Sequence, residues 1–400
     1  MKKILTLFFI LPLIFNTLNL QDFIAILVSS TAAQVLAYLN LALILVGTVL
    51  CIKEKGLVSA TAKLWLIFFA CYYTFGLIAS VYTKYTPSLA KTLIPVIYFY
   101  GFYVFLSNVN NRKITFRVIT ICLVTACIML VILYNLNFDL DYGGVHIYKI
   151  DRAGGLYGDA NNAALVCILA YLFFNKFFVA KNHRQKALKI LGILFILYSL
   201  FLTFSTTGLS TFLIVLLLSN YKYFRGIRIM FLVVAFISIF LVVLNLQSIT
   251  KDMNLSSAQR VKIENLTNVI TLNTDKVDNS GRGDLLANLM SYIYENPIIG
   301  NGVDFAVSIR GHNTYMGVWA DAGIFVFILF CIILFTHLFR ALKLELQLKF
   351  FVLSVVFTLC VFMLSLQTVI NQAYIMVIFC TLGYLIDFGE DNSLRPHTLA

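Results

Sequence analysis

Residues 188–221 form one long apolar stretch, which reads LKILGILFILYSLFLTFSTTGLSTFLIVLLLSNY. A single transmembrane helix needs only about 20 residues to cross a hydrocarbon core of roughly 30 Å, so this stretch is too long for one crossing. Basic residues stand at both ends, namely Lys181, Arg184, Lys186 and Lys189, and then Lys222, Arg225 and Arg228. Because lysine and arginine stay on the cytoplasmic side, we expect a tight helical hairpin whose outer tip is 205–208.

The whole chain has the composition of a membrane protein. It has 400 residues, of which 60% are hydrophobic and 12% charged, and its mean hydropathy is +0.90. These values exclude an ordinary soluble domain. Twelve apolar segments are long enough to be predicted as helices: 4–20, 33–52, 64–82, 92–108, 114–136, 162–180, 188–204, 208–221, 229–246, 314–338, 350–366 and 372–388. The sequence predicts an all-α polytopic membrane protein with one membrane domain over 1–400.

The charged residues indicate how the chain is oriented. With twelve crossings, 20 of the 30 lysines and arginines fall on the cytoplasmic side, and 13 of the 18 acidic residues fall on or near the outer side. Both termini are therefore predicted to be cytoplasmic. The net charge of +12 reflects this topology, so we expect no nucleic-acid partner. The first segment lacks a convincing cleavage site and is expected to be retained as a helix.

Cysteines and histidines give no sign of a metal centre. All eight cysteines lie within or at the edges of predicted helices, so no disulfide framework is indicated. The sequence contains neither a cluster of His and Cys ligands nor a closely spaced aspartate pair for a divalent ion. We expect no metal site and no cofactor.

Two predicted outer segments are much longer than the other connections. They are 137–161 and 247–313, and loops of such length are usually functional or disordered. In the second, apolar residues recur at helical spacing between Ser280 and Asn296. This pattern predicts a helix that lies along the membrane surface.

The motifs of these two loops resemble a known family. The stretch ENPIIGNG (295–302), a short gap and then GHNTYMGVWADAGI (311–324) opening a helix resemble the O-antigen ligase and O-antigen polymerase superfamily. DRAGGLYGDANNAA (151–164) is similar to the family's other recurring segment. The twelve-helix pattern agrees, although the sharp motifs occupy only part of the chain.

This resemblance implies a bacterial inner-membrane glycosyltransferase whose active site faces the periplasm. Such enzymes transfer a glycan from undecaprenyl diphosphate to a sugar hydroxyl. The acceptor is another lipid-linked repeat unit in polymerases, lipid A-core in ligases and a protein side chain in a third branch. The implied partners are these lipid-linked glycans and acceptors, the lipid bilayer, and chain-length regulator and flippase proteins.

Arginine and histidine side chains of the loops suit this chemistry. A guanidinium binds phosphate oxygens through paired hydrogen bonds, and Arg282 is the first candidate, followed by Arg152 and Arg310. His312 is the only histidine of 247–313 and is the candidate general base. The alternatives are that the arginines only anchor the chain at the membrane interface and that the histidine only caps a helix.

Other polar residues are candidates for sugar binding. Asp159 and Asn161 offer oxygens and amides to sugar hydroxyls, or they only cap a glycine-rich turn. Asn313 is expected to cap the following helix, to orient His312 or to touch sugar. Asp321 lies inside a predicted span, where it either pairs with an arginine or serves as a structural contact.

The hairpin tip departs from the pattern of many relatives, which carry an arginine there. This chain has FSTTGLST (204–211) and no cation. The difference favours a polymerase, or a divergent member of the family, over a ligase, with Arg152 or Arg310 supplying the charge. A transporter or flippase is a weaker alternative, because its helices should carry more ionisable residues at mid-membrane.

Overall fold

The structure is a computed structural model that divides into two compact units. The first is Met1–Thr125 together with Gly281–Ala400, and the second is Ala126–Ser280. One membrane domain over the whole chain stays a prediction, and each unit is described by itself below. The residues that the structure describes are 2–52, 56–140, 143–146, 150–220, 230, 234, 237–238, 241–242, 244–251, 255–271, 273, 281–367 and 369–389.

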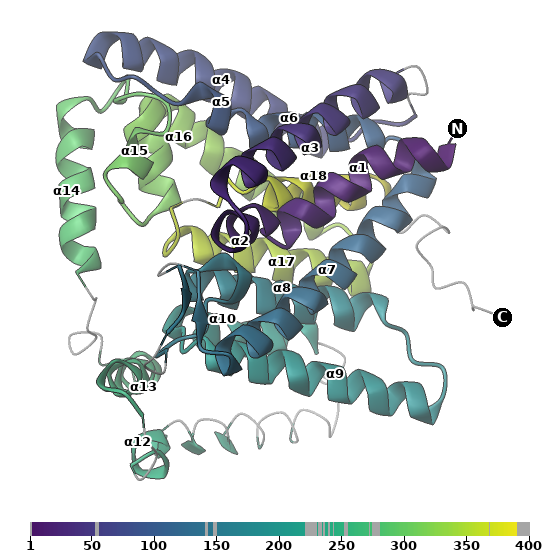
Figure 1. Cartoon of the computed structure of the whole chain (residues 1–400), viewed down its shortest axis with the longest axis vertical. Helices are drawn as coiled ribbons and strands as arrows, with labels where there is room; N and C mark the ends of the chain where they lie inside the picture. Colours follow the sequence, from purple (N-terminus) through teal and green to yellow (C-terminus); the bar gives the residue numbers. More distant parts are fainter. Residues whose placement is uncertain are drawn as a thin grey trace. The chain divides into compact units, whose positions relative to one another are not determined.

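The first unit is built from helices. They are α1 (Lys2–Thr17), α2 (Leu20–Leu27), α3 (Ser30–Cys51), α4 (Ala60–Thr83), α5 (Leu89–Thr92), α6 (Ile94–Phe105), the first part of α7 (Val109–Asn135), α14 (Arg282–Glu295), α15 (Phe305–Ser308), α16 (Thr314–Ala341), α17 (Leu346–Met363) and α18 (Ala373–Phe388). Helix α16 packs against α4, α14, α15 and α17, and α14 and α15 lie beside it in Figure 1.

The second unit adds a small hairpin of strands to its helices. It holds the rest of α7, β1 (Phe138–Asp139), β2 (Gly144–Val145), the 3-10 turn η2 (Gly155–Tyr157), α8 (Ala160–Phe177), α9 (His183–Leu202), α10 (Thr206–Ser219), α12 (Leu246–Ile249) and α13 (Ser257–Ile270). The two strands are antiparallel, with Phe138 opposite Val145 and Asp139 opposite Gly144.

The long apolar helices confirm the prediction of a polytopic all-α membrane protein. Among the described residues, seven helices are long and apolar enough to cross a membrane: α3, α4, α7, α8, α9, α16 and α17. An eighth is gained if α1 and α2, which are bent by 66° at their junction, count as one span. Three shorter apolar helices follow the predicted segments at Leu89–Phe105, Thr206–Ser219 and Ala373–Phe388.

The exact number of crossings stays a prediction. Eleven of the twelve predicted segments overlap helices of the structure. Half of the twelfth, 229–246, lies outside the described residues. The expected break in 188–221 is present, because α9 ends at Leu202 and α10 begins at Thr206.

An aromatic core joins three helices of the first unit. Trp65 of α4 is fully buried, and its ring lies 4.6 Å from that of Phe379 in α18 and 6.0 Å from that of Phe330 in α16. Arg340 of α16 and Asp387 of α18 form an ion pair, with 3.3 Å between Nη1 and Oδ1. These contacts hold α16 in place, and the ENPIIGNG segment packs on α16.

Candidate functional site

Helix α16 is broken at Gly323, and the break is covered by the ENPIIGNG segment. Gly323 has φ 83° and ψ 177°, which no helical residue adopts. The N–H of Ile324 donates to the carbonyl oxygen of Pro297 at 3.1 Å instead of to its own helix. A Cβ atom at position 323 would lie 1.9 Å from the carbonyl oxygen of Ile298. Only glycine allows this approach of two backbones.

The second half of ENPIIGNG donates hydrogen bonds to carbonyl groups of α16 that precede the break. The N–H of Asn301 donates to the carbonyl oxygen of Ala320 at 2.7 Å, and that of Gly302 donates to the carbonyl oxygen of Asp321 at 3.0 Å. A Cβ atom on Gly300, whose φ is 90°, would lie 2.6 Å from the same oxygen of Asp321. The two motif stretches are therefore two halves of one structural element.

The carboxylate of Asp321 accepts hydrogen bonds inside the protein. Asp321 is 5% exposed. Its Oδ2 accepts a hydrogen bond from the Tyr72 hydroxyl at 2.6 Å, and its Oδ1 accepts one from the N–H of Ala306 at 2.7 Å. The Tyr72 oxygen in turn accepts from the N–H of Asp304 at 3.2 Å. Of the two alternatives for Asp321, these contacts favour the structural one, because they tie α16 to α4 and α15.

The helix predicted before these motifs is α14. It begins at Arg282, after Gly281 with φ 73°, and ends at Glu295. The expected cap Ser280 and the side chain of Arg282 lie outside the described part of the chain. Leu289 and Ile293 are fully buried in a cluster with Ala306 and Ala320. Helix α14 is thus fixed to α15 and α16 at one side.

The segment from Arg310 to His312 folds tightly onto α14. Arg310 and His312 both have left-handed backbones, with φ 56° and 49°, and both side chains are exposed. Between them, a Cβ atom on Gly311 would lie 2.4 Å from Cδ2 of Leu289. The missing side chain lets the segment reach α14, and its neighbours then project from the surface.

His312 is held at the start of α16 by two neighbours. Its N–H donates to Oε1 of Gln367, in the connection between α17 and α18, at 3.2 Å. The next residue, Asn313, caps α16, because its Oδ1 accepts from the N–H of Met316 at 3.0 Å. The cap expected for Asn313 is confirmed, and its contact with sugar stays a prediction.

Asp304 was missed by the sequence reasoning. This half-buried residue lies between the two motifs, directly before α15, and its φ is 62°. Its Oδ1 accepts from Nδ2 of Asn371 at 2.7 Å. Burial raises the pKa of the Asp304 carboxyl, and the bond from Asn371 opposes that rise. The sequence signal that could have identified Asp304 is its place as a single acidic residue between two motifs, 295–302 and 311–324.

In the second unit, Arg152 lies against the hairpin tip. Its Nε donates to the carbonyl oxygen of Thr203 at 3.1 Å. Its Nη2 lies 3.4 Å from Oδ1 of Asn161, which also accepts from the Ser205 hydroxyl at 2.8 Å. The tip has no cation in its own sequence, yet the guanidinium of another segment is bonded to it.

Asp159 and the glycines before it build the predicted turn. Oδ1 of Asp159 accepts from the N–H groups of Asn161 and Asn162 at 2.9 and 2.8 Å, which caps α8. A Cβ atom on Gly154 would lie 1.7 Å from the carbonyl oxygen of Gly158. The turn and the cap agree with the structural alternative for Asp159, and sugar binding there stays a prediction.

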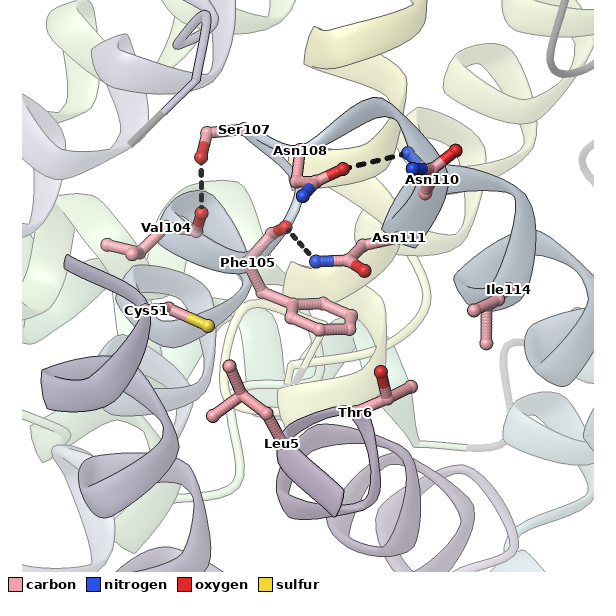
Figure 2. Close-up of a pocket in the computed structure, with 10 residues that line it drawn as sticks. All are labelled: Leu5, Thr6, Cys51, Val104, Phe105, Ser107, Asn108, Asn110, Asn111 and Ile114. Atoms are coloured by element: carbon pink, nitrogen blue, oxygen red, sulfur yellow. Dashed lines mark hydrogen bonds between the residues drawn. The ribbon is translucent and has the colours of Figure 1, made fainter. Parts of the chain in front are cut away.

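A pocket of the first unit lies away from these residues. It has a volume of about 210 Å³ and is lined from α1, α3, α6 and α7. In Figure 2, the N–H of Asn110 donates to Oδ1 of Asn108, and Nδ2 of Asn111 donates to the Phe105 carbonyl oxygen, with Leu5 and Thr6 below them. None of the predicted site residues lines this pocket. Within the described ranges, no group of three or more His, Cys, Asp or Glu side chains could hold a metal ion.

Comparison with known proteins supports the resemblance of the motifs. A family model described as O-antigen ligase matches residues 191–331. The matched segment includes the hairpin tip, Arg282, His312 and the break in α16. It does not include 151–164. No curated protein matches the chain.

Proposed function

We propose that this chain, which belongs to the O-antigen ligase and O-antigen polymerase superfamily through residues 191–331, is a polymerase of bacterial surface polysaccharide. It transfers a glycan from an undecaprenyl-diphosphate donor to a sugar hydroxyl at the periplasmic face of the inner membrane. The observation that carries the proposal is the placement of the Arg310–His312 segment. It lies inside the matched region, on α14 and at the start of α16, with His312 exposed.

The reaction needs one base and one binder of phosphate. The acceptor oxygen attacks the anomeric carbon and forms the new glycosidic bond. The bond from that carbon to the diphosphate oxygen breaks, and undecaprenyl diphosphate leaves with the electron pair. The acceptor proton goes to a ring nitrogen of His312, because histidine is the side chain that most often serves as a general base.

Arg282 is proposed to bind the diphosphate. It is the first residue of α14, and a helix N-terminus favours negative charge through its free N–H groups and its dipole. A guanidinium adds a planar pair of donors that match phosphate oxygens. Arg310, in the exposed segment before His312, is the second candidate of the first unit.

Arg152 is proposed to replace the arginine that many relatives carry at the hairpin tip. It is bonded to the tip through the carbonyl oxygen of Thr203 and through Asn161. Asn161 thereby positions the guanidinium, and Asp159 supports it by capping α8. The tip itself has no cation in its sequence. This difference from many relatives favours a polymerase over a ligase within the proposed glycosyl transfer.

A chain-length profile of surface polysaccharide tests the function. We expect a strain that lacks the gene to carry single repeat units on its surface glycan, because attachment continues without polymerisation. Lipid-linked polymer that stays unattached would instead identify a ligase. The purified protein in detergent should also transfer glycan, because transfer needs no sealed membrane. A flippase would show no transfer under these conditions.

A further inference from the structure

Three aromatic rings form a row on the loops around Asp304. The ring of Phe305, in α15, lies 5.3 Å from that of Tyr85 and 5.1 Å from that of Tyr292, both in edge-to-face geometry. Tyr85 follows α4, and Tyr292 belongs to α14. All three side chains are half-buried, in contrast to the fully buried aromatic core around Trp65.

Polar groups adjoin this row. Asp304 precedes Phe305, and one of its carboxylate oxygens is held by Asn371. Among the residues that the structure describes, no hydrogen bond is recorded for the second oxygen of Asp304 or for the hydroxyls of Tyr85 and Tyr292. The row therefore combines aromatic rings with a carboxylate and two phenolic hydroxyl groups.

The backbone around the row is fixed by close contacts. A Cβ atom on Gly302, whose φ is 130°, would lie 2.8 Å from Cδ1 of Tyr85 and 2.6 Å from Oγ of Ser80. Ser80 also accepts a hydrogen bond from the N–H of Val303 at 3.2 Å. The conformation that brings Phe305 between the two tyrosines is thus built into the fold and does not depend on a ligand.

We propose that Tyr85, Tyr292, Asp304 and Phe305 form a carbohydrate-binding subsite for the acceptor glycan. This assignment rests on the proposed glycosyl transfer. A sugar ring has an apolar face of C–H groups and a rim of hydroxyls. An aromatic face covers the first, and a carboxylate accepts hydrogen bonds from two neighbouring hydroxyls.

Charge and position favour the acceptor over the donor. The carboxylate of Asp304 repels the diphosphate of the donor and is compatible with the hydroxyls of a glycan. Asn371, which holds Asp304, and Gln367, which holds the backbone of His312, belong to the same short connection between α17 and α18. This connection links the subsite to the general base.

Steady-state kinetics of the purified protein test the subsite. The donor is lipid-linked glycan extracted from the host strain, and the acceptor is an oligosaccharide cleaved from the same strain's surface polysaccharide. We expect Phe305→Leu, which keeps an apolar side chain but loses the ring, to raise the KM for the acceptor roughly tenfold. Asp304→Asn, which tolerates the left-handed backbone, should raise it by a similar factor. The KM for the donor should stay within about twofold.

Matched variants separate binding from packing. Phe305→Tyr retains the ring and should keep the KM for the acceptor closer to that of the wild type than Phe305→Leu does. Tyr294→Ala removes a tyrosine of the same helix α14 that is 73% exposed and is absent from the row, so it should change neither KM. An unchanged acceptor KM in Phe305→Leu, or equal rises for donor and acceptor, would overturn the proposal. So would a Phe305→Tyr variant as poor as Phe305→Leu.

Saturation-transfer NMR with the same oligosaccharide separates a failure of the proposed subsite from a failure of the proposed glycosyl transfer. If the wild type transfers no glycan but shows saturation transfer that Phe305→Leu loses, the subsite stands and the proposed reaction fails. If the wild type transfers glycan, and if Phe305→Leu and Asp304→Asn show the same saturation transfer as the wild type, the proposed reaction stands and the proposed subsite is wrong.

Discussion

At the scale of single residues, the candidate site depends on side chains whose backbones are unusually constrained. His312 has a left-handed backbone, its N–H is bound by Gln367, and the next residue caps α16. A capping role therefore belongs to Asn313, and the imidazole of His312 is not needed for it. Because the cap is made by Asn313, substitution of His312 tests the role of the imidazole without removing the cap.

We expect His312→Gln to reduce glycan transfer by about 10² to 10⁴-fold, the usual contribution of a general base. His312→Asn should be equally poor, because it suits the left-handed backbone better than glutamine and still accepts no proton. Both variants should insert into the membrane and retain donor, as measured by co-purified lipid-linked glycan. Near-normal polymer from either variant would limit His312 to positioning, and the carboxylate of Asp304 would be the next candidate for the general base.

Arg282 makes the second prediction at this scale. If its guanidinium binds the diphosphate as a planar fork, Arg282→Lys should transfer glycan almost as poorly as Arg282→Ala, since lysine keeps the charge and loses the paired donors. The measurement is the rate of transfer with saturating acceptor. Activity of Arg282→Lys close to the wild type would mean that only a positive charge is required, and normal activity of Arg282→Ala would remove Arg282 from the mechanism.

At the scale of elements, local patterns predicted the helices but not how the motifs pair. Apolar length alone identified α3, α4 and α16, and helical spacing identified α14. The break in α16 could not be predicted, because its hydrogen bonds go to Pro297, more than twenty residues earlier. Asp304 was missed for the same reason: its partner Asn371 is 67 residues away.

The break gives a prediction about stability. Gly323→Ala places a Cβ atom 1.9 Å from the Ile298 carbonyl oxygen in a left-handed backbone, whereas Gly317→Ala meets only Ala306 Cβ at 3.5 Å. We expect Gly323→Ala to destabilise the protein by about 2 kcal/mol or more, and Gly317→Ala in the regular helix to be neutral or mildly stabilising. Thermal unfolding of the two purified variants in the same detergent measures the difference. Equal Tm values would contradict the role assigned to the break.

At the scale of the whole molecule, function depends on which side of the membrane the loops occupy. The family match supports the chemistry of 191–331, but orientation rests on the distribution of charge, in which 20 of 30 lysines and arginines fall on one predicted side. The donor carries its glycan on a lipid, so the residues that bind it must lie at the membrane surface where the glycan is exposed. Orientation is therefore a condition for every role proposed above.

Cysteine labelling of intact cells tests that condition. In a background without the eight native cysteines, a membrane-impermeant maleimide should label Thr271→Cys, in the predicted outer loop that leads to Arg282. It should not label Gln185→Cys, because the basic segment 181–189 is predicted to be cytoplasmic. Permeabilised cells supply the control, since both positions should then be labelled. The reverse pattern in intact cells would place His312 and Arg282 on the cytoplasmic side, and periplasmic transfer by these residues would be impossible.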